Sequence, residues 1–307
     1  MAHFNLPSNM LEYATLQEYL DSSEKQKPKE IDLMALLISN NIQSMSLNMT
    51  MFSTVSTPSF TSWIIPETWE HIFNTQYGVF ELNRAYSKLR DIVSRGNIVF
   101  PPEKEIFRAF ELCKWDKIKV IILGQDPFPK FDSIVNLPMA CGLSFSGRKG
   151  GMKPGSLANV FTEIDRTFPG IPLNHYDLTS WAEQGCLMLN VCLTVNQGNP
   201  DSHKKVWDDF IEYVIRSIND QKTGVVFLLW GNRAKSYSSL INKKNYILEA
   251  GHPSNLNSSV HKFAENNHFA YIYYIIQQRN QEIYVKNQTL PADQQIPYIE
   301  QINWSLV

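Results

Sequence analysis

The chain has 307 residues, of which 43% are hydrophobic, and a formal net charge of −2. This length is enough for one large domain or two small ones with a sizeable core, and the charge excludes a strong overall basic field. The longest apolar runs, such as residues 225–230, are too short to cross a bilayer, so no membrane partner is expected.

The cysteines show no pattern of a metal site or a redox pair. No CxxC occurs among Cys113, Cys141, Cys186 and Cys192. Reduced thiols of this kind are typical of an intracellular protein. Because the cysteines lack the spacing of a metal site, no metal is expected, and no other cofactor is expected either.

Residues 1–62 differ from the rest of the chain. Two short amphipathic pieces, 11–20 and 31–42, precede a stretch at 44–61 that is rich in Ser, Thr, Met and Asn. This pattern predicts a flexible or partly helical N-terminal extension. Two interpretations stay open, a segment that binds a protein partner and a plain disordered tail.

Residues 63–307 have the pattern of a folded domain. Strands are expected at 119–124, 186–195, 225–230 and 246–250. Helices are expected from Pro66 and at 103–115, 156–168 with Ser156 as N-cap, 204–219, 233–241 and 263–278. This alternation predicts an α/β fold, a three-layer α/β/α arrangement around a central four-stranded, mainly parallel sheet.

The strand at 119–124 is followed at once by a carboxylate, Asp126, between an amide (Gln125) and an aromatic ring (Phe128). Ligands of open α/β sheets bind outside the carboxyl ends of the strands. Asp126 alone is equally compatible with a turn aspartate that caps the next segment.

Three more polar residues lie at or just after the ends of the other expected strands: Asn190, Asn232 and His252. Each by itself is typical of a structural core amide or histidine. Because the carboxyl ends of parallel strands meet at one edge of a sheet, the four residues together favour a site there.

Five segments of the chain resemble the signature segments of family 1 uracil-DNA glycosylases, in the family's order and with similar spacing. They are Gly124-Gln125-Asp126-Pro127-Phe128, Gly142-Leu143-Ser144-Phe145-Ser146, Leu187-Met188-Leu189-Asn190, Phe227-Leu228-Leu229-Trp230-Gly231 and His252-Pro253-Ser254-Asn255-Leu256. Smaller matches lie at 101–102, 181–185, 202–204 and 302–304, and the resemblance covers roughly residues 64–307.

The resemblance implies a monofunctional enzyme of DNA base-excision repair, which hydrolyses the N-glycosidic bond of deoxyuridine in DNA and leaves an abasic site. Such an enzyme must flip its base out of the stack. An ionised Asp126 would then position the water and stabilise the cation-like sugar, while His252, as a neutral imidazole, would donate a hydrogen bond to uracil O2.

The resemblance also assigns the base-binding residues. Gln125 would contact the O2 edge through its backbone, Asn190 would read the O4/N3 edge and reject cytosine, and Phe145 would stack on uracil. Phe128 stands where the family usually has tyrosine, and its ring is expected to exclude the methyl group of thymine.

The resemblance implies that Leu256 is the intercalating wedge. Ser156, Asn232 and Ser254 stand at segment starts and are expected to bind phosphates. Residues 230–262 carry five basic side chains and one acid, a balance of +4, which favours a DNA-backbone surface.

Some positions depart from the family's pattern. Pro129 replaces a common histidine, Asn255 replaces a common proline, and insertions are expected at 130–140 and 282–299. These departures concern the approach of the substrate more than bond cleavage.

Two rival functions stay open from the sequence: a catalytically weak glycosylase fold that acts as a DNA-binding replication scaffold, and another α/β hydrolase acting on nucleotides. A monomer is expected, located in the nucleus of a eukaryotic or virus-infected cell or in a bacterial cytoplasm.

Overall fold

The computed structural model describes residues 63, 65–254 and 263–307. Contacts between Cα atoms divide the chain into two units, Met1–Trp63 and Ile64–Val307. Every helix and strand described below belongs to the second unit. The expected extension 1–62 and the expected wedge Leu256 lie outside the described residues.

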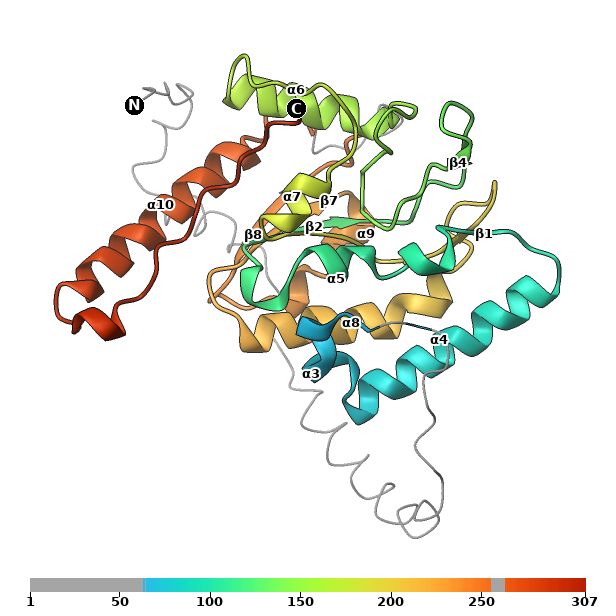
Figure 1. Ribbon diagram of the computed structural model, residues 1–307, viewed down its shortest axis with the longest axis horizontal. Helices are drawn as coiled ribbons and strands as arrows, with labels where there is room; N and C mark the ends of the chain where they lie inside the picture. Colours follow the sequence, from blue (N-terminus) through green and yellow to red (C-terminus); the bar gives the residue numbers. More distant parts are fainter. Residues whose placement is uncertain (1–62, 64, 255–262) are drawn as a thin grey trace, which may run out of the picture. The chain divides into compact units, whose positions relative to one another are not determined.

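A four-stranded sheet forms the centre of this unit (Figure 1). Its strand order is β5 (Cys186–Asn190), β2 (Val120–Gly124), β7 (Val226–Trp230) and β8 (Tyr246–Ala250), and every neighbouring pair is parallel. All residues of β2, β5 and β7 are buried, which explains why these strands are apolar on both faces. The four-stranded sheet predicted from the sequence is confirmed.

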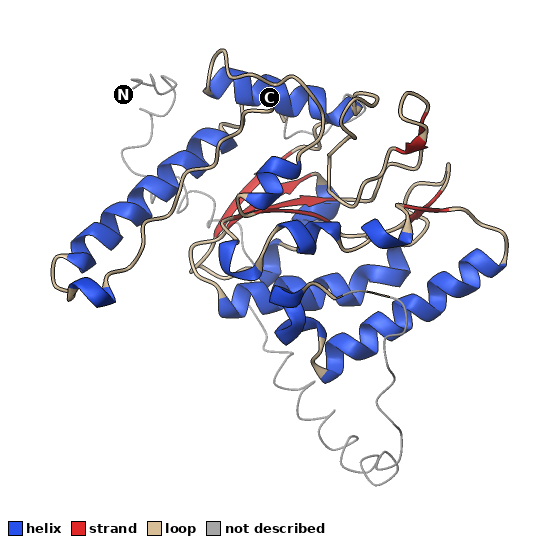
Figure 2. Ribbon diagram, in the orientation of Figure 1, coloured by secondary structure: helices blue, strands red, loops and turns tan. Residues whose placement is uncertain are grey.

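Helices cover both faces of the sheet, so the predicted three-layer α/β/α arrangement is confirmed (Figure 2). On one side α4 (Gln76–Ser94) packs against α8 (Lys204–Gln221), and on the other α6 (Gly155–Thr167) contacts α10 (His268–Asn287). Four shorter helices complete the layers: α3 (Glu70–Phe73), α5 (Arg108–Leu112), α7 (Thr179–Glu183) and α9 (Asn232–Lys235).

The inner face of α8 shows why these layers are stable. Val206, Phe210, Val214 and Ile218, four residues apart in the sequence, are all buried, as the predicted amphipathic pattern requires. The Phe210 ring lies 5.3 Å from that of Phe73, between ring centroids. Burying one such side chain contributes roughly 1.5–3 kcal/mol.

Several predicted boundaries are wrong. The expected helix 103–115 is broken into η4 (Glu103–Glu105), α5 and η5 (Trp115–Lys117), and α9 is followed by a separate η6 (Ser238–Leu240). In both segments the apolar side chains reach the core through short turns, which a periodic pattern does not distinguish from a continuous helix.

The expected strand 186–195 ends at Asn190, and residues 195–196 form β6 (Val195–Asn196), which pairs antiparallel with β1 (Val99–Phe100). The last long helix begins at His268 rather than Phe263. Helix α4 was not predicted from the sequence, because exposed Tyr77 and Phe80 interrupt its narrow buried stripe.

Both expected insertions have defined structure. Residues 130–140 contain a hairpin of β3 (Phe131–Asp132) and β4 (Leu137–Pro138), whose turn is held by the buried Asp132 carboxylate. Residues 282–299 comprise the end of α10, η7 (Ala292–Gln294) and a segment that runs back along α10. The Asn280 side chain bonds the backbone of Ile299, and the Asn287 side chain bonds the backbone of Ile296, which holds this segment against the helix.

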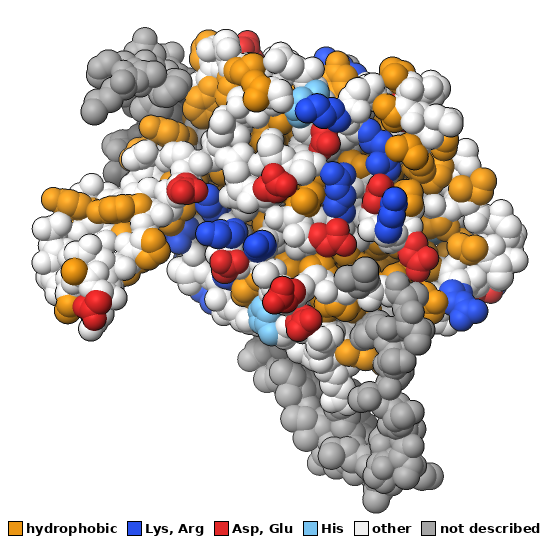
Figure 3. All heavy atoms as spheres, viewed as in Figure 1, with side chains coloured by type: hydrophobic (Ala, Val, Ile, Leu, Met, Phe, Trp, Pro, Cys, Tyr) orange, Lys and Arg blue, Asp and Glu red, His pale blue; other side chains and the backbone are white. Residues whose placement is uncertain are grey.

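Basic and acidic side chains are interspersed on the face shown in Figure 3, in keeping with the small net charge. None of the helices in the described ranges is both long and apolar enough to cross a membrane.

Candidate active site

A pocket of about 450 Å³ opens at the carboxyl ends of the parallel strands. It is lined by nine of the residues singled out from the sequence: Gln125, Asp126, Phe128, Phe145, Ser156, Asn190, Asn232, His252 and Ser254. They come from the loops after β2 and β8, from the start of α9, from the end of β5, from the 141–154 segment and from α6. The sheet topology therefore brings together residues up to 129 positions apart, from Gln125 to Ser254.

The Asp126 carboxylate is held by the backbone of a distant loop. The Asp201 N–H donates to Asp126 Oδ2 over 2.8 Å. Burial raises the pKa of Asp126, the N–H bond from Asp201 opposes this rise, and the negative charge of Asp201 adds to it. The carboxylate is thus oriented, partly withdrawn from water and placed next to a second acid.

The geometry of His252 assigns its proton to one nitrogen. The Ser254 N–H donates to Nδ1 over 3.1 Å, so in the neutral ring the proton is on Nε2. Burial lowers the pKa of His252, which favours this neutral form. The ring can therefore donate a hydrogen bond from Nε2 without carrying a charge.

Gly124 and Asn190 are register partners across β2 and β5. A Cβ atom on Gly124 would lie 2.3 Å from Asn190 Oδ1, so a glycine is required for the amide to occupy this place. Asn190 is 8% exposed, and its amide lines the pocket as both a donor and an acceptor.

Phe145 has a left-handed backbone, with φ of 62°. This conformation is disfavoured for a bulky residue. The preceding residue, Ser144, holds the backbone in this conformation with two hydrogen bonds of 3.0 Å. Its hydroxyl donates to Ile122 O, and its N–H donates to Met188 O. The ring packs against Trp230 and His252, at centroid distances of 5.4 and 5.8 Å, and lines the pocket.

The three polar residues expected at phosphates have different local roles. Ser156 is inside α6, whose N-cap is Pro154 without a side-chain capping bond, so the predicted N-cap role of Ser156 is wrong. Pro154 lacks a side-chain acceptor, and its fixed φ suits the residue before the helix. Ser254 N–H bonds His252, and Asn232 begins α9.

The described part of the expected basic surface, residues 230–254, is divided between the two ends of the strands, and Lys262 lies outside the described residues. Arg233 lines the pocket and forms an ion pair with Asp208 of α8. Lys243 and Lys244 precede β8 and therefore lie at the opposite edge, where the Lys244 ammonium donates to Asp220 O. A charge count along the sequence could not show this, because one strand separates the two groups.

Asp201, which belongs to the loop between β6 and α8, was not predicted from the sequence. This loop is fixed by the matched segment 202–204: Ser202 Oγ accepts from Asn196 N–H over 2.8 Å, and the His203 ring bonds Thr194 Oγ1 and Asn196 Oδ1. Burial lowers the pKa of His203 to about 4, so it is neutral in this network. The match at 202–204 was the one signal in the sequence that pointed to the loop.

Metal ligands do not gather in the part of the chain that the structure describes: no three His, Cys, Asp or Glu side chains are placed to hold an ion. All four cysteines are buried free thiols, and burial raises the pKa of Cys113 and Cys192 to about 12.

Comparisons with known proteins agree with this architecture. Residues 110–276 match the family model described as the uracil DNA glycosylase superfamily. The uracil-DNA glycosylases of Yersinia pestis (strain Pestoides F) and Yersinia pseudotuberculosis (serotype I, strain IP32953) are each 42% identical over 201 residues, covering 64% of this chain and 85% of theirs.

Among solved structures, mimivirus uracil-DNA glycosylase superposes with a TM-score of 0.63 at 28% identity, covering 71% of this chain and 85% of that one. A point variant of mimivirus UNG in complex with UGI gives a TM-score of 0.66 at 25% identity, covering 79% of this chain and 89% of that one. On its sequence, its fold and the residues gathered at the carboxyl edge of its sheet, this chain belongs to the uracil DNA glycosylase superfamily.

Proposed function

We propose that the protein is a monofunctional uracil-DNA glycosylase of base-excision repair, in which Asp126 and His252 carry the catalytic step. The enzyme hydrolyses the N-glycosidic bond of deoxyuridine in DNA. The family match and the curated relatives support this reaction, and they do not favour a catalytically inactive scaffold. The pocket supports the roles of the individual residues.

One observation carries the assignment of roles. Asp126 and His252 follow different strands, β2 and β8, yet line the same pocket as Asn190 and Phe145. A carboxylate, a neutral donor, an amide and a ring face around one slot are the groups that a flipped pyrimidine requires. Gln125 lines the same pocket and adds its backbone to the O2 edge.

The chemistry follows from these positions. As the glycosidic bond breaks, the sugar becomes positive and uracil becomes negative. Asp126 orients the attacking water and faces the positive sugar; two unit charges about 4 Å apart at an effective dielectric near 20 attract by roughly 4 kcal/mol. That energy corresponds to about a thousandfold in rate. His252 Nε2–H stabilises the charge that gathers on uracil O2.

Base choice is assigned to Asn190 and Phe128. The Asn190 amide pairs with the O4 and N3 positions of uracil, whereas the amino group of cytosine would leave a buried donor unpaired, at a cost of roughly 1–3 kcal/mol. The Phe128 ring lines the pocket and excludes the C5 methyl group of thymine by its bulk.

DNA is the proposed macromolecular partner, held by Ser156, Asn232 and Ser254 at its phosphates and by Leu256 in the base stack. All nine described site residues lie between 125 and 254, which supports a glycosylase domain at 63–307. A protein partner for residues 1–62, the monomeric state and the cellular compartment stay predictions.

The test is single-turnover cleavage of U:A, U:G and T:G duplexes by the wild type, Asp126→Asn and the control Asp293→Asn, which removes an exposed carboxylate from η7. The wild type and the control should release uracil from U:A and U:G and nothing from T:G. Asp126→Asn should be slower by about a thousandfold, with DNA affinity nearly unchanged.

Two results would contradict these assignments. If wild type in large excess released no uracil from either substrate, the scaffold alternative would be favoured. If Asp126→Asn cleaved as fast as the control, the role of Asp126 would be wrong.

A further inference from the structure

Asp201 is attached to the reactive end of the pocket by two hydrogen bonds of different kinds. Its backbone N–H donates to Asp126 Oδ2 over 2.8 Å, and its side-chain Oδ2 accepts from Gln125 Nε2 over 2.8 Å. Two consecutive residues of the loop after β2 are thus fixed by one residue that lies about 75 positions away.

The backbone of Asp201 is in the left-handed conformation. Its φ is 60°, in the left-handed region that only glycine, asparagine and aspartate adopt at low cost. This conformation is imposed by the surrounding loop, in which Ser202 and His203 bond residues 194 and 196. The loop therefore presents one N–H to one carboxylate oxygen in a fixed direction.

We propose that Asp201 is a positioning residue for glycosidic cleavage, which orients the Asp126 carboxylate through its backbone N–H and holds the Gln125 side chain through its own carboxylate. This inference rests on the proposed function. A carboxylate that is free to rotate would place the attacking water less accurately, and a misplacement of about 1 Å can cost on the order of a hundredfold in rate.

The charge of Asp201 provides a readout that a merely structural residue would not give. Other titratable groups lie around Asp126: Arg233 on α9 and His252 after β8 line the same pocket, and Cys192 after β5 interacts with Asp126 electrostatically. Burial raises the pKa of Cys192 to about 12 and lowers the pKa of His252, and the charge of Arg233 is balanced by Asp208.

Asp201, in contrast, is bonded by a neutral amide, and no cation pairs with it in the described ranges of the chain. Its negative charge raises the pKa of Asp126. Removal of that charge should therefore lower the pKa of Asp126 and extend activity to lower pH.

The experiment compares Asp201→Asn with the control Asp293→Asn in full-length protein, using single-turnover cleavage of U:G duplex from pH 4 to pH 8. Asparagine keeps the backbone N–H, tolerates the left-handed φ and still accepts from Gln125. The acid limb of the pH–rate profile should move down by about 0.5 pH unit at low salt, and by less at high salt, whereas that of the control should coincide with that of wild type.

A second variant, Asp201→Val, tests positioning directly, since a β-branched residue does not adopt this φ. Its single-turnover rate should fall by at least about tenfold with DNA affinity within about threefold of wild type. The proposal is overturned if the acid limb of Asp201→Asn coincides with that of wild type, or if Asp201→Val either cleaves normally or loses affinity instead of rate. A wild type that releases no uracil would instead overturn the proposed function.

Discussion

Gly124 and Asn190 are packed tightly against each other at the ends of β2 and β5. Asn190 stands at the end of β5 beside Gly124 of β2, and there is no room between them for a methyl group: a Cβ atom on Gly124 would lie 2.3 Å from Asn190 Oδ1 and 2.8 Å from Ser144 Cβ. Because Ser144 also fixes Phe145, one added carbon would disturb both the amide and the ring that we assign to uracil.

Gly124→Ala is expected to lower kcat/KM for uracil release by at least about a hundredfold, since Asn190 must move to make space. The control is Gly155→Ala at the start of α6, where an added Cβ meets nothing within 4 Å and which should keep full activity. Steady-state cleavage of U:A duplex measures both. Equal activities of the two variants would contradict the assigned place of Asn190.

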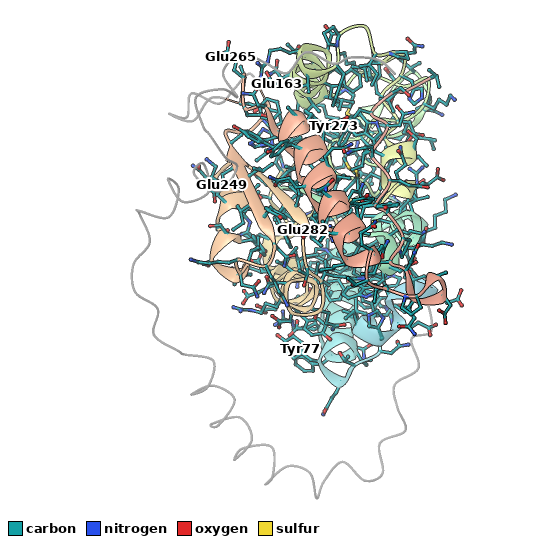
Figure 4. The ribbon with its side chains drawn as sticks, turned by 90° about the vertical axis from the view of Figure 1, so that its left-hand side faces the viewer. Tyr77, Glu163, Glu249, Glu265, Tyr273 and Glu282 are labelled. Atoms are coloured by element: carbon teal, nitrogen blue, oxygen red, sulfur yellow. The ribbon has the colours of Figure 1, made fainter. Side chains whose placement is uncertain are left out.

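Among the elements, α6 fixes both ends of the segment that contains Leu256. Asn159 Nδ2 donates to Pro253 O over 2.6 Å on one side, and Glu163 Oε1 accepts from Glu265 N–H over 2.7 Å on the other. Figure 4 shows Glu163 and Glu265 close together near the start of α10. Glu163 is buried and also pairs with Arg166.

Glu163→Ala should lower the free energy of unfolding by about 2 kcal/mol, because it leaves the Glu265 N–H without its acceptor and removes the ion pair with Arg166, which keeps its bond to Asn267 Oδ1. It should also weaken duplex binding more than the single-turnover rate. Denaturant unfolding and a binding titration test this.

Glu212→Ala is the matched control, since it removes an exposed helical ion pair with Arg216 and should cost no more than about 0.5 kcal/mol. An equal loss of stability in the two variants would contradict the role of Glu163.

At the scale of the whole molecule, two buried neutral histidines limit stability in acid. Burial lowers the pKa of His203 to about 4 and that of His268 to about 3, from 6.5 in the unfolded chain. Below pH 6.5 these histidines therefore bind more protons in the unfolded chain than in the folded protein. Their full contribution to the free energy of unfolding is present above that pH and is lost as the pH falls toward 4.

The expected loss between pH 7 and pH 4 is about 2–3 kcal/mol per histidine. Denaturant unfolding at several pH values measures it. His203→Gln should show a shallower dependence on pH, whereas His71→Gln, at an exposed position, should follow the wild type. Parallel curves for all three proteins would contradict this explanation.

Much of this molecule follows from local patterns. The apolar runs predicted four strands and their alternation with helices predicted a three-layer parallel sheet, because burial on both faces requires continuous hydrophobic sequence. Nine of the residues singled out from the sequence line the pocket. The breaks in 103–115 and the helix α4 did not follow, since short turns and a narrow buried stripe leave no distinct period.

What only the tertiary structure decided are the relations between distant segments. The sequence determined which residue types stand after each strand, but Asp201 reaches Asp126 only because the β6–α8 loop folds back over the end of β2. Likewise, Lys243 and Lys244 are near Arg233 in the sequence yet lie at the other edge of the sheet. A parallel strand separates its two ends by its full length, so proximity along the chain does not become proximity at the site.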